Sequence, residues 1–280
     1  MKSISRRQFI GAAATLTAGL PQLSADPLGL PIGCQVYPVR EMLGKDFEGT
    51  LKVIAGIGYK TIEMCSPKGY EKGGFGPLVK YTPLELRDKI HAAGLKCESC
   101  HFQTRELNEN IGETVAFAKG IGLSQMILAS FGMRKEATLD DWKRAAADLN
   151  KAGETAQKAG LQVGFHNHDG EFQKVGGELI YDELMKALDP NLVKMQFQVS
   201  VVSLGYEAAD MFKKYPGRFI SIHLQDWSPA EKKTVAIGKG SVDWKNLFAA
   251  AKKAGVKNYF VELNLNQMKE SYAYLHSLKA

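Results

Sequence analysis

The chain has 280 residues, of which 45% are hydrophobic and 24% are charged, with 36 lysines and arginines against 30 aspartates and glutamates. This small positive excess argues against a nucleic-acid-binding protein, and four cysteines are too few for a disulfide scaffold. A chain of this length can bury the core of a single α/β barrel.

The first 25 residues have the features of an export signal. Arg6 and Arg7 precede Phe9 and an uncharged, apolar stretch over 11–20, and small residues follow, so we expect cleavage near Ala25. This order is typical of a twin-arginine signal; the alternatives are an ordinary secretory signal or a basic tail. The apolar stretch is too short for a stable membrane anchor. We therefore expect a periplasmic protein.

After residue 25, apolar runs typical of strands alternate with segments of helical periodicity. We expect strands at 33–39, 61–65, 96–101, 125–131, 162–168, 193–200, 219–224 and 259–263. We expect helices at 47–57, 84–93, 111–121, 139–159, 181–188, 208–215, 244–254 and 270–278. Asp46, Thr82 and Asp243 are candidate caps that open helices, and glycines such as Gly58 and Gly160 close them.

Strict alternation of strand and helix predicts a parallel sheet. Eight such units without an interrupting linker predict a (β/α)8 TIM barrel that forms one domain over 26–280. An open doubly wound sheet is the alternative, but it usually carries a glycine-rich turn after the first strand, where this chain has YPVR at 37–40. Cys97 and Cys100 have the spacing of a redox pair, yet they lie inside a predicted strand, which favours a structural role.

Four of the six histidines stand at the ends of predicted strands. His101 ends the third predicted strand, and His166 and His168 lie at the end of the fifth. His223 lies in the seventh predicted strand and Glu262 in the last. In a parallel barrel the carboxyl ends of the strands form the active site. Because burying imidazoles and carboxylates is costly without compensation, this grouping predicts a metal site or an acid/base site.

The segment 66–81 follows the second strand and therefore lies on the same face. It contains four glycines, two prolines and three aromatic residues, Tyr70, Phe75 and Tyr81. We interpret it as a candidate lid whose aromatic side chains stack on a sugar. The alternative is a long surface loop without such a role.

Four segments together resemble the sugar phosphate isomerase/epimerase family of xylose-isomerase-like barrels. They are FHNHDGEF at 165–172, HLQD at 223–226, IGKGSVDW at 237–244 and YFVE at 259–262. The resemblance covers the whole mature chain, and its HNHxxEF motif and twin-arginine signal point to one subgroup. It is specific for the superfamily rather than for a substrate.

The resemblance implies a divalent cation (Mn, Mg, Co or Zn) held by side chains of strands five to eight. Carried over residue by residue, the ligands are His166 or Glu171, then His223 and Glu262. On the sixth strand the family pattern has aspartate, whereas this chain has Gln198. A neutral amide offers no charge, so the metal is expected to bind more weakly or to be lost.

With a metal, the expected chemistry is enediolate formation, because a cation on a sugar carbonyl acidifies the neighbouring C–H group. Glu262 is the candidate base, and His101 and His168 are candidates to hold or protonate sugar oxygens. Three further side chains are expected to bind the substrate: Glu63, Tyr37 and Asp226. A salt bridge at the barrel rim is the alternative role for Glu63.

The leading hypothesis is thus a metal-dependent isomerase or epimerase of a small sugar or keto-sugar. A lyase or hydratase that acts on oxidised sugars is close behind. A metal-free, non-catalytic carbohydrate-binding barrel is the second class, motivated by Gln198. A nuclease like the endonuclease IV branch is disfavoured by the small charge, so we expect a small carbohydrate as the partner and no nucleic acid. The oligomeric state stays open.

Overall fold

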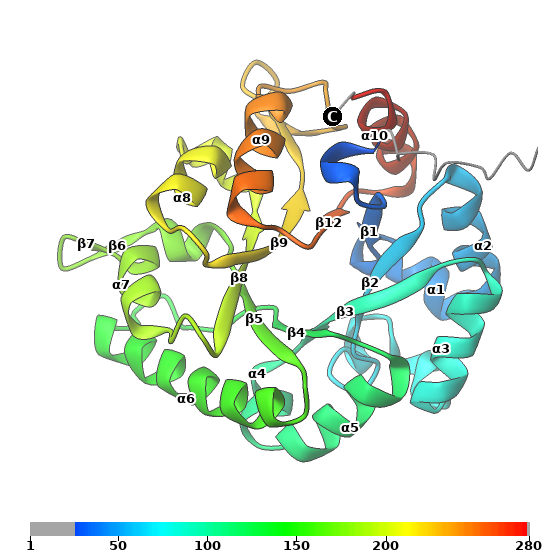
Figure 1. The fold of residues 1–280 in the computed structure, drawn as a ribbon, viewed down its shortest axis with the longest axis horizontal. Helices are drawn as coiled ribbons and strands as arrows, with labels where there is room; N and C mark the ends of the chain where they lie inside the picture. The colour runs from blue at the N-terminus through cyan, green and yellow to red at the C-terminus, as the bar shows by residue number, and fades with distance from the viewer. Residues whose placement is uncertain (1–25, 279–280) are drawn as a thin grey trace, which may run out of the picture.

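Eight parallel strands close into a barrel in the computed structural model, which describes residues 26–278 (Figure 1). The predicted export signal at 1–25 lies outside the described residues. The strands follow the order β1-β12-β9-β8-β5-β4-β3-β2 around the barrel. Their bounds are β1 Gly33–Gln35, β2 Thr61–Cys65, β3 Lys96–Phe102, β4 Gln125–Leu128, β5 Gln162–His166, β8 Val193–Gln198, β9 Phe219–Leu224 and β12 Asn258–Val261. The predicted TIM barrel is confirmed.

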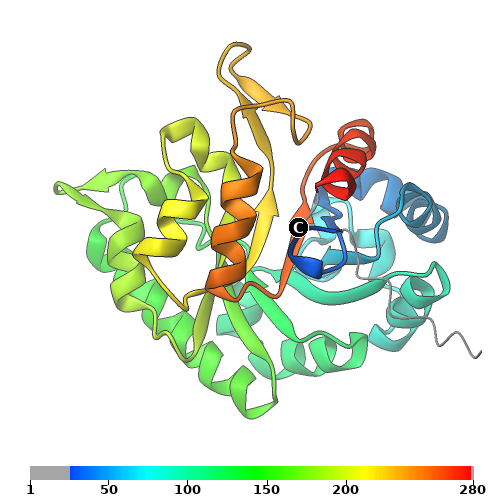
Figure 2. The same ribbon diagram turned by 45° about the horizontal axis from the view of Figure 1, so that its top comes forward.

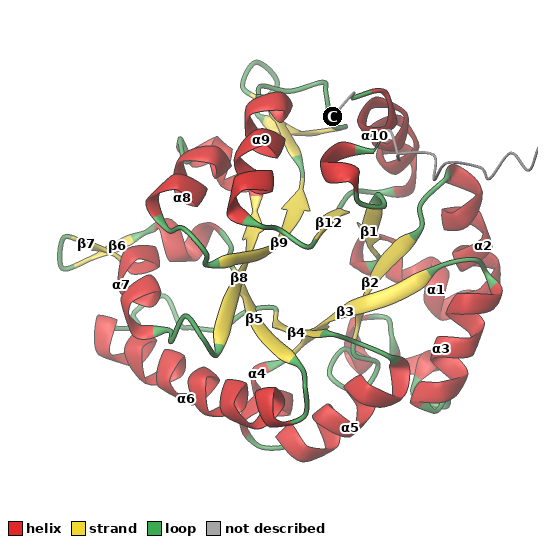
Figure 3. Cartoon of the chain, in the orientation of Figure 1, coloured by secondary structure: helices red, strands yellow, loops and turns green. Residues whose placement is uncertain are grey.

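A ring of helices surrounds the barrel (Figure 3). The main ones are α2 Phe47–Ile57, α3 Pro83–Ala92, α5 Ile111–Ile121, α6 Leu139–Lys158, α7 Ile180–Ala187, α8 Ala208–Lys214, α9 Trp244–Ala254 and α10 Leu265–Ser277. The predicted caps are confirmed, since Asp46, Thr82 and Asp243 each accept a backbone N–H of the first turn. Helix α10 begins earlier than predicted because Asn264 caps it.

The first strand is shorter than predicted. It ends at Gln35, and Tyr37–Val39 forms a 3-10 turn instead. Pro38 has no backbone N–H and cannot continue the hydrogen-bonded ladder. This turn and the following short helix α1 (Arg40–Lys45) lift Tyr37 to the rim of the barrel mouth.

Further small elements decorate the carboxyl end of the strands. They are helix α4 (Thr104–Asn108) and two antiparallel hairpins, β6 (Lys174–Val175) with β7 (Glu178–Leu179) and β10 (Asp226–Ser228) with β11 (Lys233–Val235). Figure 2 shows the β10–β11 hairpin projecting beyond the helix ring. Among residues 26–278, no helix combines the length and apolarity that a membrane span requires.

The interior of the barrel changes in character along its axis. Near the amino ends of the strands, a Cβ atom added to Gly33 would lie 2.5 Å from Thr61 Oγ1 and 2.6 Å from Phe260, so only glycine fits there. Near the carboxyl ends, the interior is filled by polar side chains that are buried, including Glu63, His101, Gln196 and His223. Cys97 and Cys100 are buried free thiols, as a structural role requires.

Candidate active site

Three of the predicted histidines meet inside the barrel mouth. His101 on β3, His166 at the end of β5 and His223 on β9 are buried, and each offers a nitrogen that lies within 4.8 Å of those of the other two. His168 follows β5, and its ring stands edge-on against His166 with the ring centroids 4.7 Å apart. The structure thus brings together all four histidines of the predicted strand ends.

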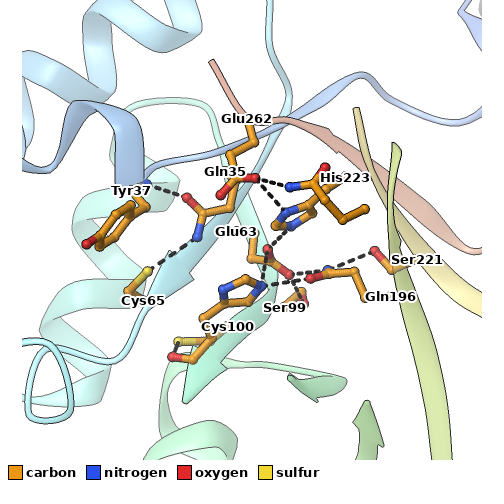
Figure 4. Close-up of polar contacts among 12 residues, drawn as sticks. Gln35, Tyr37, Glu63, Cys65, Ser99, Cys100, Gln196, Ser221, His223 and Glu262 are labelled. Atoms are coloured by element: carbon orange, nitrogen blue, oxygen red, sulfur yellow. Dashed lines mark hydrogen bonds and ion pairs between the residues drawn. The ribbon is translucent and has the colours of Figure 1, made fainter. Parts of the chain in front are cut away.

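Glu63 of β2, whose side chain is fully buried, lies between His223 and the side chains of Gln196 and Ser99 (Figure 4). Its Oε2 accepts from His223 Nε2 at 2.5 Å and lies 3.1 Å from His101 Nε2. Its Oε1 accepts from Ser99 Oγ at 2.6 Å and Gln196 Nε2 at 2.7 Å. Burial raises the pKa of Glu63, but the two imidazoles outweigh this and hold it well below its usual range. Glu63 is therefore neither a rim salt bridge nor exposed to substrate, in contrast to the predictions.

His223 lies between two carboxylates. Besides Glu63 at Nε2, its Nδ1 is 3.3 Å from Glu262 Oε2. Burial lowers the pKa of His223, but Glu63 and Glu262 outweigh it and raise the pKa to about 9. In the absence of a cation, His223 is an imidazolium at neutral pH.

Glu262 follows β12 at the floor of an open cavity of about 580 Å³, called here the mouth cavity. Its Oε2 also accepts from Gln198 Nε2 at 2.6 Å and Gln225 Nε2 at 3.1 Å. Its Oε1 has no hydrogen-bond partner in the described part of the chain. The mouth cavity is lined by Tyr37, Pro38, Arg40, His168, Asp169, Gly170, Gln198, Ser200, Gln225 and Glu262. Hydrogen bonds thus hold Oε2 of Glu262 in place, while the residue lines the mouth cavity.

The donor atoms around this floor fit a divalent cation. His166 Nδ1 and Gln198 Oε1 are buried acceptors that lack a hydrogen-bond partner within residues 26–278. Burial and the neighbouring imidazoles lower the pKa of His166 well below its usual range, which leaves a neutral ring with a lone pair. The 3.3 Å between His223 Nδ1 and Glu262 Oε2 is a separation that two ligands about 2.1 Å from one ion can have. Glu63 behind His223 matches the carboxylate that commonly orients a ligating histidine.

Two predicted site residues, Glu171 and Asp226, instead accept hydrogen bonds within their own loops. Glu171, a predicted metal ligand, folds back onto its own turn, where its Oε2 accepts from the backbone N–H of His168 at 2.7 Å, and burial raises its pKa to about 7. Asp226, predicted to bind substrate, is 1% exposed and accepts from the backbone of Trp227, Gly238, Gly240 and Val242 and from Trp244 Nε1. Both carboxylates satisfy local N–H groups, which the sequence pattern does not distinguish from a site role.

The segment predicted as a lid is folded rather than open. Phe75 is fully buried, and Tyr81 stacks on Phe47 with ring centroids 6.2 Å apart, so neither faces the mouth. Tyr70 is partly exposed and lies edge-on to Tyr37 at 6.0 Å, and the buried Phe75 stacks on the same ring at 6.5 Å.

Strand alternation predicts that Gln196, Ser99 and Ser221 share a face with predicted site residues, but it assigns them no role; the structure makes them members of the buried network. Gln196 Nε2 also donates to Ser221 Oγ at 3.1 Å, and its Oε1 lies 2.7 Å from His101 Nε2. Each of these residues stands two positions before a predicted site residue on the same strand. Because side chains alternate along a strand, this spacing was the available signal.

A closed parallel barrel with buried imidazoles and carboxylates at the carboxyl ends of its strands defines an enzyme-like α/β barrel. Residues 51–278 match the family described as "Xylose isomerase-like TIM barrel", and the chain belongs to this family.

Similar proteins include an inosose dehydratase of Clostridium perfringens, which is 29% identical over an alignment of 203 residues; the match covers 66% of this chain and 65% of that protein. The match thus spans slightly less than two thirds of that relative. Among solved structures, a sugar phosphate isomerase/epimerase from Parabacteroides distasonis covers 96% of this chain and 98% of its own, with 24% identity and a TM-score of 0.78. A xylose isomerase-like barrel from Mycobacterium smegmatis in complex with magnesium covers 89% and 96%, with 14% identity and a TM-score of 0.63. The two structures establish likeness of fold.

Proposed function

We propose that this protein is an enzyme that moves a proton at the carbon next to the carbonyl of a keto-sugar or keto-polyol. The observation that carries the proposal is Glu262, which lies at the floor of the mouth cavity with Oε2 held by the side-chain amides of Gln198 and Gln225 and with Oε1 unpartnered among residues 26–278. A carboxylate fixed in this way is suited to act as a general base. His168 lines the same cavity and is placed to hold or protonate a sugar oxygen.

The same first step leads to two reactions. Return of the proton to the other face or to the neighbouring carbon gives an epimerase or isomerase, which we favour. Loss of a hydroxyl from the next carbon gives a dehydratase, and the similarity to an inosose dehydratase supports this as the second candidate.

We propose that His166, Gln198, His223 and Glu262 hold a divalent cation during this reaction. Such an ion, when bound, polarises a carbonyl and stabilises the enediolate. Glu63 fixes the ring of His223 from below through Nε2. His101, also tied to Glu63, borders the cluster and is 5% exposed. A barrel that binds carbohydrate without metal or catalysis is the competing proposal, and the neutral amide of Gln198 is its basis.

Glu262→Gln tests the proposed function. Keto-sugars and inososes are incubated with the protein in D2O, and exchange of the C–H next to the carbonyl is followed by NMR. We expect the wild type to catalyse exchange and Glu262→Gln to lose at least about 100-fold in rate, since the general base is removed. His91→Gln, on helix α3 away from the mouth, is the control.

Elemental analysis of protein purified without chelator accompanies this test. Exchange that is equally fast in Glu262→Gln would contradict the assignment of the base. Absence of both metal and exchange would favour the carbohydrate-binding barrel. The proposal also includes export to the periplasm, which rests on the twin arginines Arg6 and Arg7.

A further inference from the structure

A second cavity, called here the side cavity, lies next to the mouth cavity. Its volume is about 810 Å³, and it is enclosed by the loop after β2, the start of α4 and helix α5. Tyr37 lines both cavities, so the two spaces adjoin at this residue. Figure 4 shows this ring at the edge of the buried polar network. A ligand long enough to pass Tyr37 would reach from the mouth cavity into the side cavity.

The walls of the side cavity combine aromatic faces with polar groups. Tyr37 and Tyr70 meet edge-to-face at 6.0 Å on one side, and Phe117 of α5 contributes a third ring. All three rings are only partly buried. Arg40 lies 4.3 Å from the centroid of the Tyr37 ring and Phe75 stacks on this ring at 6.5 Å, so Tyr70 and Phe117 are the rings left to contact a ligand. Gln103 and Asn110 add amide groups to the lining. Aromatic surface with a few placed hydrogen-bonding groups is the composition of a small-molecule site, and it suits the C–H faces and hydroxyls of a sugar.

Glu106 gives this cavity a fixed polar anchor. Its carboxylate accepts a short hydrogen bond from Ser66 Oγ and a second, at 2.8 Å, from the backbone N–H of Gln103. A Cβ atom at Gly69 would lie 1.9 Å from Glu106 Oε2, so a side chain at this position would displace the carboxylate. Burial raises the pKa of Glu106. The mechanism proposed for the mouth cavity makes no use of this group.

The rim of the side cavity is crossed by one ion pair. Lys68 of the loop after β2 lies 2.8 Å from Glu113 of α5, and their side chains are 74% and 72% exposed. An ion pair exposed to this degree contributes little stability, so it can open at small cost to admit a ligand. Because cations and anions both line the cavity, it favours a neutral polar ligand over a phosphate.

We propose that the side cavity binds a second sugar ring, so that the substrate is a ketose-containing disaccharide or similar glycoside whose reacting ring occupies the mouth cavity. This inference rests on the proposed function for the location of the reacting ring. The second ring stacks on Phe117 and Tyr70, and its hydroxyls bond to Glu106 and Asn110. A single ring bound in the mouth cavity leaves the side cavity to water.

Isothermal titration calorimetry with D-fructose and with three disaccharides of fructose tests the proposal. Lactulose, turanose and isomaltulose attach a second ring at different positions of the fructose unit. We expect at least one disaccharide to bind at least tenfold more tightly than fructose. Phe117→Ala is expected to reduce this advantage below threefold, while the affinity for fructose changes less than twofold. Val115→Ala, on the same helix but outside the cavity, is the matched control.

Asn110→Trp is the second variant, because it fills the side cavity without removing packed side chains. It is expected to abolish the advantage of the disaccharide and to leave fructose binding intact. Equal affinities for fructose and all three disaccharides, or no binding of any of them, would overturn the proposal. So would an equal loss for both ligand sizes in the two variants. Because binding is measured, failure of the proton-exchange assay leaves this result interpretable and counts against the proposed function alone.

Discussion

At the scale of single residues, Gln198 controls how strongly the site attracts a cation. Its Nε2 donates to Glu262 Oε2 at 2.6 Å, while its Oε1 has no partner in the described region. A 180° rotation of the Gln198 side-chain amide exchanges the positions of Nε2 and Oε1. It then places the amide oxygen beside Glu262. A carboxylate at this position adds a negative charge near the ligands, which is worth several kcal/mol at an effective dielectric constant of about 20.

We therefore expect Gln198→Asp to bind Mn²⁺ or Zn²⁺ at least about tenfold more tightly, a difference of about 1.4 kcal/mol. Gln198→Glu keeps the length of the side chain and isolates the effect of charge. Without metal, its carboxylate faces that of Glu262, so its melting temperature falls in EDTA. Competitive chelator titration and thermal unfolding measure the two effects.

Gln225→Glu places the same charge at another donor of Glu262 and is the control for a general charge effect. Wild-type affinity equal to that of Gln198→Asp would show that the amide is a full ligand. If neither protein binds metal, the site has no cation, and carbohydrate binding without catalysis becomes the leading proposal.

At the scale of elements, the connection from β9 to α9 is organised by Asp226. Its carboxylate accepts five hydrogen bonds from residues 227–244, which include the indole N–H of Trp244 at 3.0 Å. Asp226→Ala leaves these donors unsatisfied in a buried setting, so we expect the free energy of unfolding to fall by about 3 kcal/mol. Urea denaturation measures this loss.

Asp243→Ala, which removes only the cap of α9, is expected to cost about 1 kcal/mol and serves as the reference. If Asp226 contacted substrate instead, its replacement would weaken sugar binding and leave stability nearly unchanged. That outcome would restore the role predicted from the sequence.

At the scale of the whole molecule, the charged network inside the barrel makes stability depend on pH. The pKa of His223 is raised to about 9 from an ordinary value of 6.5. Its contribution to stability is therefore complete below about pH 6.5 and is lost as the pH rises through about 9. The pKa of Glu63 is lowered, so its contribution is present above the ordinary range of glutamate and is lost in acid.

In EDTA, we expect Glu63→Gln to lower the free energy of unfolding more at pH 6.5 than at pH 9.5. At the lower pH the substitution removes an ion pair with His223, whereas at the higher pH the imidazole is already neutral. Urea denaturation of both proteins at the two pH values measures the difference. Equal losses would show that Glu63 acts only through neutral hydrogen bonds.

The fold was largely predictable because its signals are local. Apolar strand segments, helical periodicity and caps such as Asp46 and Thr82 all depend on residues only a few positions apart in the chain. The strict alternation of strands and helices then predicts a parallel barrel. The end of β1 at Gln35 was missed although Pro38 marks it. The convergence of His101, His166, His168 and His223 follows from their places at strand ends.

By itself, the sequence determined the barrel, the face that carries the site and the residue types gathered there. Only the tertiary structure decided which atoms meet: Glu63 against His223 across 160 positions, Glu171 turned back on its own loop, and a side cavity that shares Tyr37 with the mouth. The physical reason is that strand periodicity sets the direction of a side chain within one strand. The level of each side chain in the barrel depends on the register between strands and on barrel closure, which join residues far apart in the chain.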